Sequence, residues 1–66
     1  MQVVINGKQH LVEPGLRLAE AVALLTAAPS GVAAAVNGDL VRRGDWQSTE
    51  LADGDQVEVL TAVQGG

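Results

Sequence analysis

Few side chains in this chain could carry out chemistry by themselves. The sequence has no cysteine and a single histidine, His10, so it offers neither a thiol nucleophile nor a cysteine metal site. Asp53 and Asp55 are paired carboxylates, but they flank a turn glycine with no histidine or further ligand at a suitable spacing. We therefore interpret His10 as structural or exposed, and expect no metal site and no independent enzyme.

The remaining candidate group is the carboxylate at the end of the sequence VLTAVQGG. A terminal strand needs no glycine pair, because glycine loses the most backbone entropy on folding and has no side chain to pack. Gly65 and Gly66 therefore favour an end that is kept bare and flexible for another protein, with a frayed terminus as the plain alternative.

Composition and charge exclude several classes of protein. A formal net charge of -4 with only four basic residues argues against a binder of nucleic acid or anionic membrane, because both need a basic surface. The longest apolar stretch without a charge, residues 21–36, contains Pro29 and Gly31 and is no membrane span. No N-terminal cleavage signal is visible, so we expect a cytoplasmic protein. The 66 residues suffice for one domain with an aliphatic core.

Turn signals divide the chain into short strands around one helix. Asn6-Gly7 and Asn37-Gly38 predict hairpins, because both central positions of a type I′ turn need positive φ. Two hairpins on either side of one helix predict an α+β domain, with a four- to five-stranded sheet packed on one main helix. The segment at 43–49 is expected to be irregular, and the expected strands cover 2–6, 8–13, 31–37, 40–42 and 56–63.

The helix is expected over residues 18–28. Its apolar residues recur at spacings of three and four, which place one stripe toward the core: Leu18, Ala21, Val22 and Leu25. Pro29 and Gly31 are expected to stop the helix. Arg17 stands where a Ser, Thr or Asp cap is preferred, so the start of the helix looks imperfect, although Glu20 suits the positive end of the helix dipole.

The whole chain resembles the ThiS family, the sulfur carrier proteins of thiamine biosynthesis. The segments that carry the resemblance are NG near the start, PG before the helix, AVNGDLV, RGDW, LADGDQVEVLTAV and the terminal QGG. The resemblance implies the ubiquitin-like β-grasp fold over residues 1–63, followed by a flexible diglycine tail at 64–66. It also implies that the first and last strands pair in parallel in the middle of the sheet.

The resemblance further implies chemistry at Gly66. An E1-like (ThiF-like) adenylyltransferase would use ATP and magnesium to adenylate the Gly66 carboxylate, and the carrier itself would bind no cofactor. Sulfur from a donor such as cysteine desulfurase would then give a thiocarboxylate, which serves the thiazole synthase (ThiG-like). Gln64 and Gly65 would thread into the partner. Gly65 and Gly66 suit a narrow channel, because without β-carbons they adopt dihedrals closed to other residues.

Each candidate docking residue has two interpretations. Leu60 and Ala62 lie on the outer face of the last expected strand, as a docking patch or as scattered surface apolar residues. Trp46 is a partner-facing anchor or, as burial statistics favour, the residue that closes an edge of the core. An acidic group either steers a basic partner surface or forms a solvated turn: Asp53, Asp55 and Glu58.

Other functions share the fold and the diglycine end. The chain could be a carrier like the small subunit of molybdopterin synthase, a carrier for cysteine synthesis, or a ubiquitin-like modifier joined to lysines. The segment VNGDLVRRGDW and the short chain favour the thiamine carrier.

Overall fold

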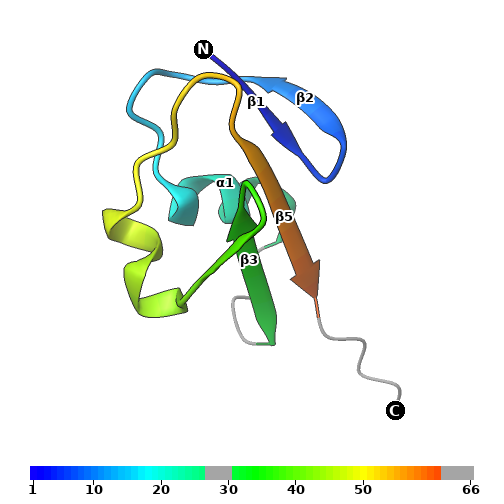
Figure 1. Cartoon of the computed structure of the whole chain (residues 1–66), viewed down its shortest axis with the longest axis vertical. Coiled ribbons are helices and arrows are strands. Elements are labelled where there is room, and N and C mark those ends of the chain that lie inside the picture. Colours follow the sequence, from blue (N-terminus) through cyan, green and yellow to red (C-terminus); the bar gives the residue numbers. More distant parts are fainter. Residues whose placement is uncertain (27–30, 62–66) are drawn as a thin grey trace.

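The computed structural model describes residues 1–26 and 31–61 and shows one mixed sheet with a helix across one face (Figure 1). The sheet has five strands in the order β2-β1-β5-β3-β4. The elements in chain order are β1 (Gln2–Ile5), β2 (Lys8–Leu11), α1 (Leu18–Leu25), β3 (Val32–Val36), β4 (Asp39–Val41), the 3-10 helix η1 (Arg43–Ser48) and β5 (Gln56–Thr61).

The central pair of strands, β1 and β5, runs parallel, with Val4 opposite Gln56 and Ile5 opposite Val57. All other neighbours in the sheet are antiparallel. Parallel neighbours need a long crossover, and here the crossover contains α1 and the second hairpin. The expected β-grasp topology is therefore confirmed, with five strands in the sheet.

Both expected hairpins form at the Asn-Gly pairs. Asn6 and Gly7 have φ values of 50° and 81°, and Asn37 and Gly38 have values of 50° and 86°. Asparagine tolerates positive φ better than most residues, and glycine adopts it without steric cost. Each turn therefore reverses the chain within two residues, which sets the register of β1 with β2 and of β3 with β4.

Helix α1 begins at Leu18 as expected but ends at Leu25, so the expected end at Ala28 is wrong. Thr26 already has extended dihedrals, φ -149° and ψ 140°, and its N–H caps the helix on the Val22 carbonyl. A β-branched residue propagates a helix poorly. The expectation that Leu25 belongs to the buried stripe is wrong, because its side chain is 43% exposed. The last buried residue of the helix is Val22. Residues 27–30 lie outside the described residues.

The start of α1 is better held than the sequence indicates. The Arg17 N–H donates to the Glu20 carboxylate at 3.0 Å, which is one half of a capping box. The Arg17 guanidinium donates to the backbone carbonyl of Gln47 at 2.8 Å and so ties the helix start to η1. Arg17 lacks an acceptor for capping, but it connects two elements instead.

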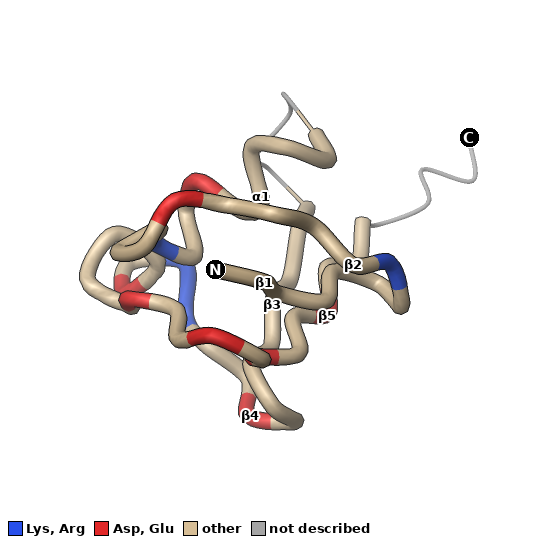
Figure 2. The backbone as a smooth tube through the Cα atoms, turned by 90° about the horizontal axis from the view of Figure 1, so that it is seen from above, with Lys and Arg blue, Asp and Glu red and all other residues tan. Residues whose placement is uncertain are grey.

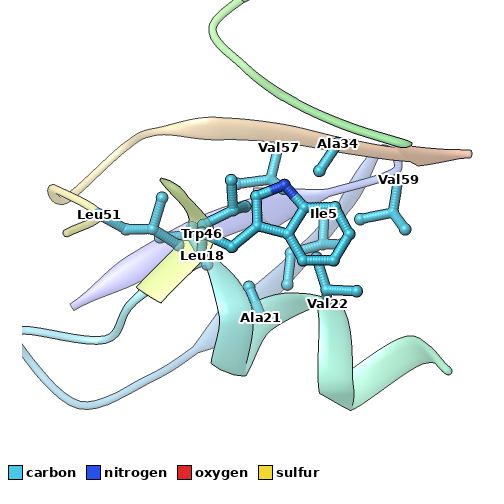
Figure 3. Close-up of a cluster of buried hydrophobic side chains, with 10 residues drawn as sticks. Ile5, Leu18, Ala21, Val22, Ala34, Trp46, Leu51, Val57 and Val59 are labelled. Carbon is cyan, nitrogen blue, oxygen red and sulfur yellow. The ribbon is translucent and has the colours of Figure 1, made fainter. Parts of the chain in front are cut away.

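The segment expected to be irregular forms η1, and η1 places Trp46 in the core. Trp46 is 5% exposed, and its indole Nε1–H donates to the Val41 carbonyl at 2.9 Å. Figure 3 shows its ring among the side chains that α1 and the sheet turn toward each other. A buried indole needs such an acceptor. The structure therefore agrees with the core interpretation of Trp46, and burial leaves little of the ring for a partner.

The core is aliphatic apart from this ring (Figure 3). Val3, Ile5, Val57 and Val59 face inward from the central pair of strands, and each is at most 5% exposed. Burying a side chain of this size stabilises a fold by about 1.5–3 kcal/mol. The other buried members come from the helix, β3 and the segment around η1: Leu18, Ala21, Val22, Ala34, Trp46 and Leu51.

Candidate functional site

Strand β5 leads directly into the segment that carries the sequence candidates for chemistry. Its burial alternates, so that Val57 and Val59 face the core while Gln56, Glu58 and Leu60 face outward. This is the period-two pattern of a half-buried strand. The strand therefore has one side that holds the fold and one side that is open to a partner.

The start of β5 is fixed by a dense set of hydrogen bonds from the acidic turn. The Asp55 carboxylate accepts the Ala52 N–H at 2.7 Å and the Asn37 side-chain amide at 2.9 Å. The Asp53 carboxylate accepts the Gln2 N–H at 2.7 Å. These two carboxylates therefore have structural partners beside the turn, in β1 and in the second hairpin, which supports the interpretation as a solvated turn.

Acidic residues do not gather around this turn alone. Figure 2 shows Asp and Glu positions at several separate places along the described chain, β4 among them. Steering of a basic partner by Asp53, Asp55 and Glu58 stays a prediction.

Val59, in the second half of β5, has a neighbour on each side. On one side Val59 pairs with Ala34 of β3. On the other side the Asn6 carboxamide accepts the Val59 N–H at 2.8 Å and donates to the Val59 carbonyl at 3.1 Å. Beyond Val59, β5 stays paired with β3 up to Thr61, the last described residue of the strand.

The outer face of the sheet carries an apolar patch beside this strand. Leu60 lies opposite Ala33 of β3, and Ala35 lies opposite both Leu40 of β4 and Glu58. Residues directly opposite one another share a face of the sheet. Leu40 and Leu60 are 76% and 67% exposed and line a shallow groove over β3. We call this group the outer-face patch: Ala33, Ala35, Leu40 and Leu60.

The sequence candidates fall into three groups in the structure. Leu60 lies on the outer face as expected, and the structure adds Leu40 to this face. The sequence signal for Leu40 was its place in the expected strand at 40–42, just after the Asn-Gly turn. Trp46 lies in the core and is not part of the outer-face patch. Ala62, Gln64, Gly65 and Gly66 lie outside the described residues.

Neither a metal centre nor a membrane span is found in the described part of the chain. Within residues 1–26 and 31–61, no three His, Cys, Asp or Glu side chains group closely enough to hold a metal ion. Half-buried His10 lies on β2, opposite Val3 of β1. No helix among these residues is long and apolar enough to cross a membrane.

The fold defines a small β-grasp protein, with a parallel pair of strands in the sheet and the helix α1 across one face. The ThiS family model matches residues 3–66. The chain belongs to the ThiS family, the sulfur carrier proteins of thiamine biosynthesis, and is a carrier rather than an enzyme.

Individual relatives agree with this assignment. The sulfur carrier protein ThiS of Escherichia coli is 29% identical over the full length of both chains. The crystal structure of the thiamine biosynthesis protein ThiS from Geobacter metallireducens superposes with a TM-score of 0.79 and 32% identity, and each chain covers the whole of the other. The thiazole synthase of Magnetococcus marinus is 35% identical over this whole chain, which spans only 20% of that longer protein.

Proposed function

We propose that the carboxylate of Gly66 is the group that receives and delivers sulfur. The observation that carries this proposal is the family match, which continues through Gln64, Gly65 and Gly66 to the end of the sequence. A carboxylate is a poor acyl donor until its oxygen becomes part of a good leaving group. Activation by a nucleotide must therefore come before sulfur transfer.

The proposed sequence of steps uses an E1-like adenylyltransferase of the ThiF type. The Gly66 carboxylate attacks the α-phosphate of magnesium-bound ATP and releases pyrophosphate, which gives an acyl adenylate. A persulfide from a donor such as cysteine desulfurase attacks the acyl carbon and displaces AMP. A thiol then attacks the donor's sulfur in the acyl disulfide, which forms a disulfide between thiol and donor and releases the thiocarboxylate. The chain has no cysteine, so no thiol of its own competes for the activated end.

We assign the final delivery of sulfur to a thiazole synthase of the ThiG type. The similarity of this whole chain to a segment of the Magnetococcus marinus thiazole synthase supports that partner. A carrier segment within a synthase chain is consistent with the two acting in one reaction sequence. The carrier is consumed and regenerated as a cosubstrate and needs no bound cofactor of its own.

The outer-face patch is the surface proposed to dock these partners. It is apolar and lies beside the strand that runs toward Gly66. Exposed apolar patches on small proteins commonly mark interaction sites. Leu40 and Leu60 are the two large exposed side chains of this patch. The alternation predicted for the last strand places Ala62 on the same face as Leu60.

Growth without thiazole tests the pathway. Deleting the gene in its own organism should create a requirement for thiazole, which the full chain relieves and a chain lacking Gly66 does not. A molybdenum-enzyme defect without a thiazole requirement would instead favour the carrier of molybdopterin synthase. Higher-mass conjugates on lysines would favour a modifier.

A further inference from the structure

The two sides of β5 are attached over different lengths. On the β3 side, pairing continues along the strand to Thr61, opposite Val32. On the β1 side, the last backbone hydrogen bond runs from the Asn6 N–H to the Val57 carbonyl at 2.9 Å. At Asn6 the φ of 50° turns the chain out of β1 and into the hairpin. The backbone of β1 therefore offers nothing to Val59.

Beyond the last backbone hydrogen bond on the β1 side, the Asn6 side chain bonds to β5. In a parallel ladder the next acceptor for the Val59 N–H would be the Asn6 backbone carbonyl. Instead, the Asn6 Oδ1 accepts this N–H at 2.8 Å, and Nδ2 donates to the Val59 carbonyl at 3.1 Å. A carboxamide carries the same donor and acceptor as a peptide group. The side chain thus adds one rung to the ladder, at the last position held on the β1 side among the described residues.

We propose that Asn6 is a positioning residue for the reaction at Gly66, a role that rests on the proposed function. Val59 lies seven residues before Gly66, and the Asn6 carboxamide is the contact that holds this part of β5 from the β1 side. Without the Asn6 carboxamide, β5 beyond Val57 is held from β3 alone. The chain then leaves the sheet over a wider range of directions, and fewer docked carriers present Gly66 to the nucleotide.

The second hairpin supplies a matched control. Asn37 occupies the same turn position with the same φ of 50°. Its Oδ1 accepts the Gln56 N–H at 2.9 Å. Asn37 is therefore hydrogen-bonded to the first residue of β5, as Asn6 is to Val59 in the second half of the strand. Asn6→Gly and Asn37→Gly both keep the turn, because glycine adopts positive φ freely, and both remove a carboxamide from β5. The two variants differ mainly in which end of the strand is released.

The experiment compares steady-state adenylation of the full chain, Asn6→Gly and Asn37→Gly by the cognate adenylyltransferase, at a temperature where thermal melts show all three folded. Each lost hydrogen bond changes an equilibrium by about two- to tenfold. In Asn6→Gly we expect kcat to fall about three- to tenfold with the KM for the carrier nearly unchanged, because docking by the outer-face patch remains. Asn37→Gly should keep kcat and KM within about twofold of the full chain.

Amide hydrogen exchange provides a readout without the enzyme. In Asn6→Gly the Val59 amide should exchange faster while the Val57 amide keeps its protection, and in Asn37→Gly the change should lie at Gln56. Equal kcat values in the two variants, or a loss in Asn6→Gly that lies entirely in KM, would overturn the positioning role and leave the proposed function standing. Absence of adenylation in the unaltered chain would overturn the proposed function and the positioning role with it.

Discussion

The two ends of β5 differ in what holds them and in what they lead to. At its start, Gln56 follows a turn in which Asp53 and Asp55 are both hydrogen-bonded, and Asn37 closes the junction. In its second half, the Val59 backbone is bonded to the Asn6 carboxamide, and Leu60 and Thr61 still pair with β3. Both halves of β5 contribute to the core, but only the second half leads on to Gly66, the reactive end in the proposed function.

The largest change in folding stability is expected from a substitution on the core-facing side of the first half of β5. Val57→Ala removes two buried methyl groups from a side chain that is 1% exposed and should lower the free energy of unfolding by about 2 kcal/mol. That is a large share of the roughly 3–10 kcal/mol expected for a domain of this size. Glu58→Ala, on the outward side next to it, is the matched control and should change stability by less than about 0.5 kcal/mol.

Urea titration of the two variants gives these free energies directly. Equal midpoints would contradict the assignment of the two faces of β5, since one face would then contribute no more to the fold than the other.

A substitution in the second half of β5 is expected to have a smaller effect, on binding to the adenylyltransferase rather than on folding. Leu60→Ser removes an exposed apolar side chain from the outer-face patch and should raise the KM of the adenylyltransferase for the carrier about tenfold, with stability within about 0.5 kcal/mol. Leu11→Ser is the control, because Leu11 is 84% exposed but lies on β2, at the opposite edge of the sheet from β4. A KM that rises equally in both variants would show that the outer-face patch has no special role.

The smallest effect is expected at the acidic turn. Asp55→Ala removes the acceptor of two hydrogen bonds, from Ala52 and from Asn37, and should cost about 1 kcal/mol of stability while leaving the KM for the carrier unchanged. Asp55→Asn keeps one acceptor oxygen and should lose less. If instead either variant raised KM, and more so at low salt, the carboxylate would be steering a basic partner surface.

Local patterns in the sequence predicted the parts of the fold that depend on neighbouring residues. The two Asn-Gly turns and the start of α1 follow from residue type and spacing. The parallel pairing of β1 with β5 came from the resemblance to the ThiS family, because periodicity carries no information on which strands become neighbours.

The features that the sequence missed depend on contacts between distant residues. The Asn6 carboxamide bonds to a residue 53 positions away, and nothing around Asn6 distinguishes it from an ordinary turn asparagine. Likewise, the pattern of residues 43–49 indicates an irregular segment. In the structure η1 places Trp46 in the core, where its indole donates to the Val41 carbonyl. Leu40 joins Leu60 only through the register of three strands.

The most direct test of the central claim is the intact mass of the carrier after reaction. The chain is incubated with its adenylyltransferase, ATP, magnesium, a persulfide donor and a thiol, and the product is fragmented to locate the change. We predict a mass increase equal to one oxygen-for-sulfur exchange, located at Gly66 and absent from a folded chain that lacks Gly66. An unchanged mass with an enzyme that is active on another carrier, or an exchange located elsewhere in the chain, would contradict the assignment of Gly66 as the sulfur-carrying end.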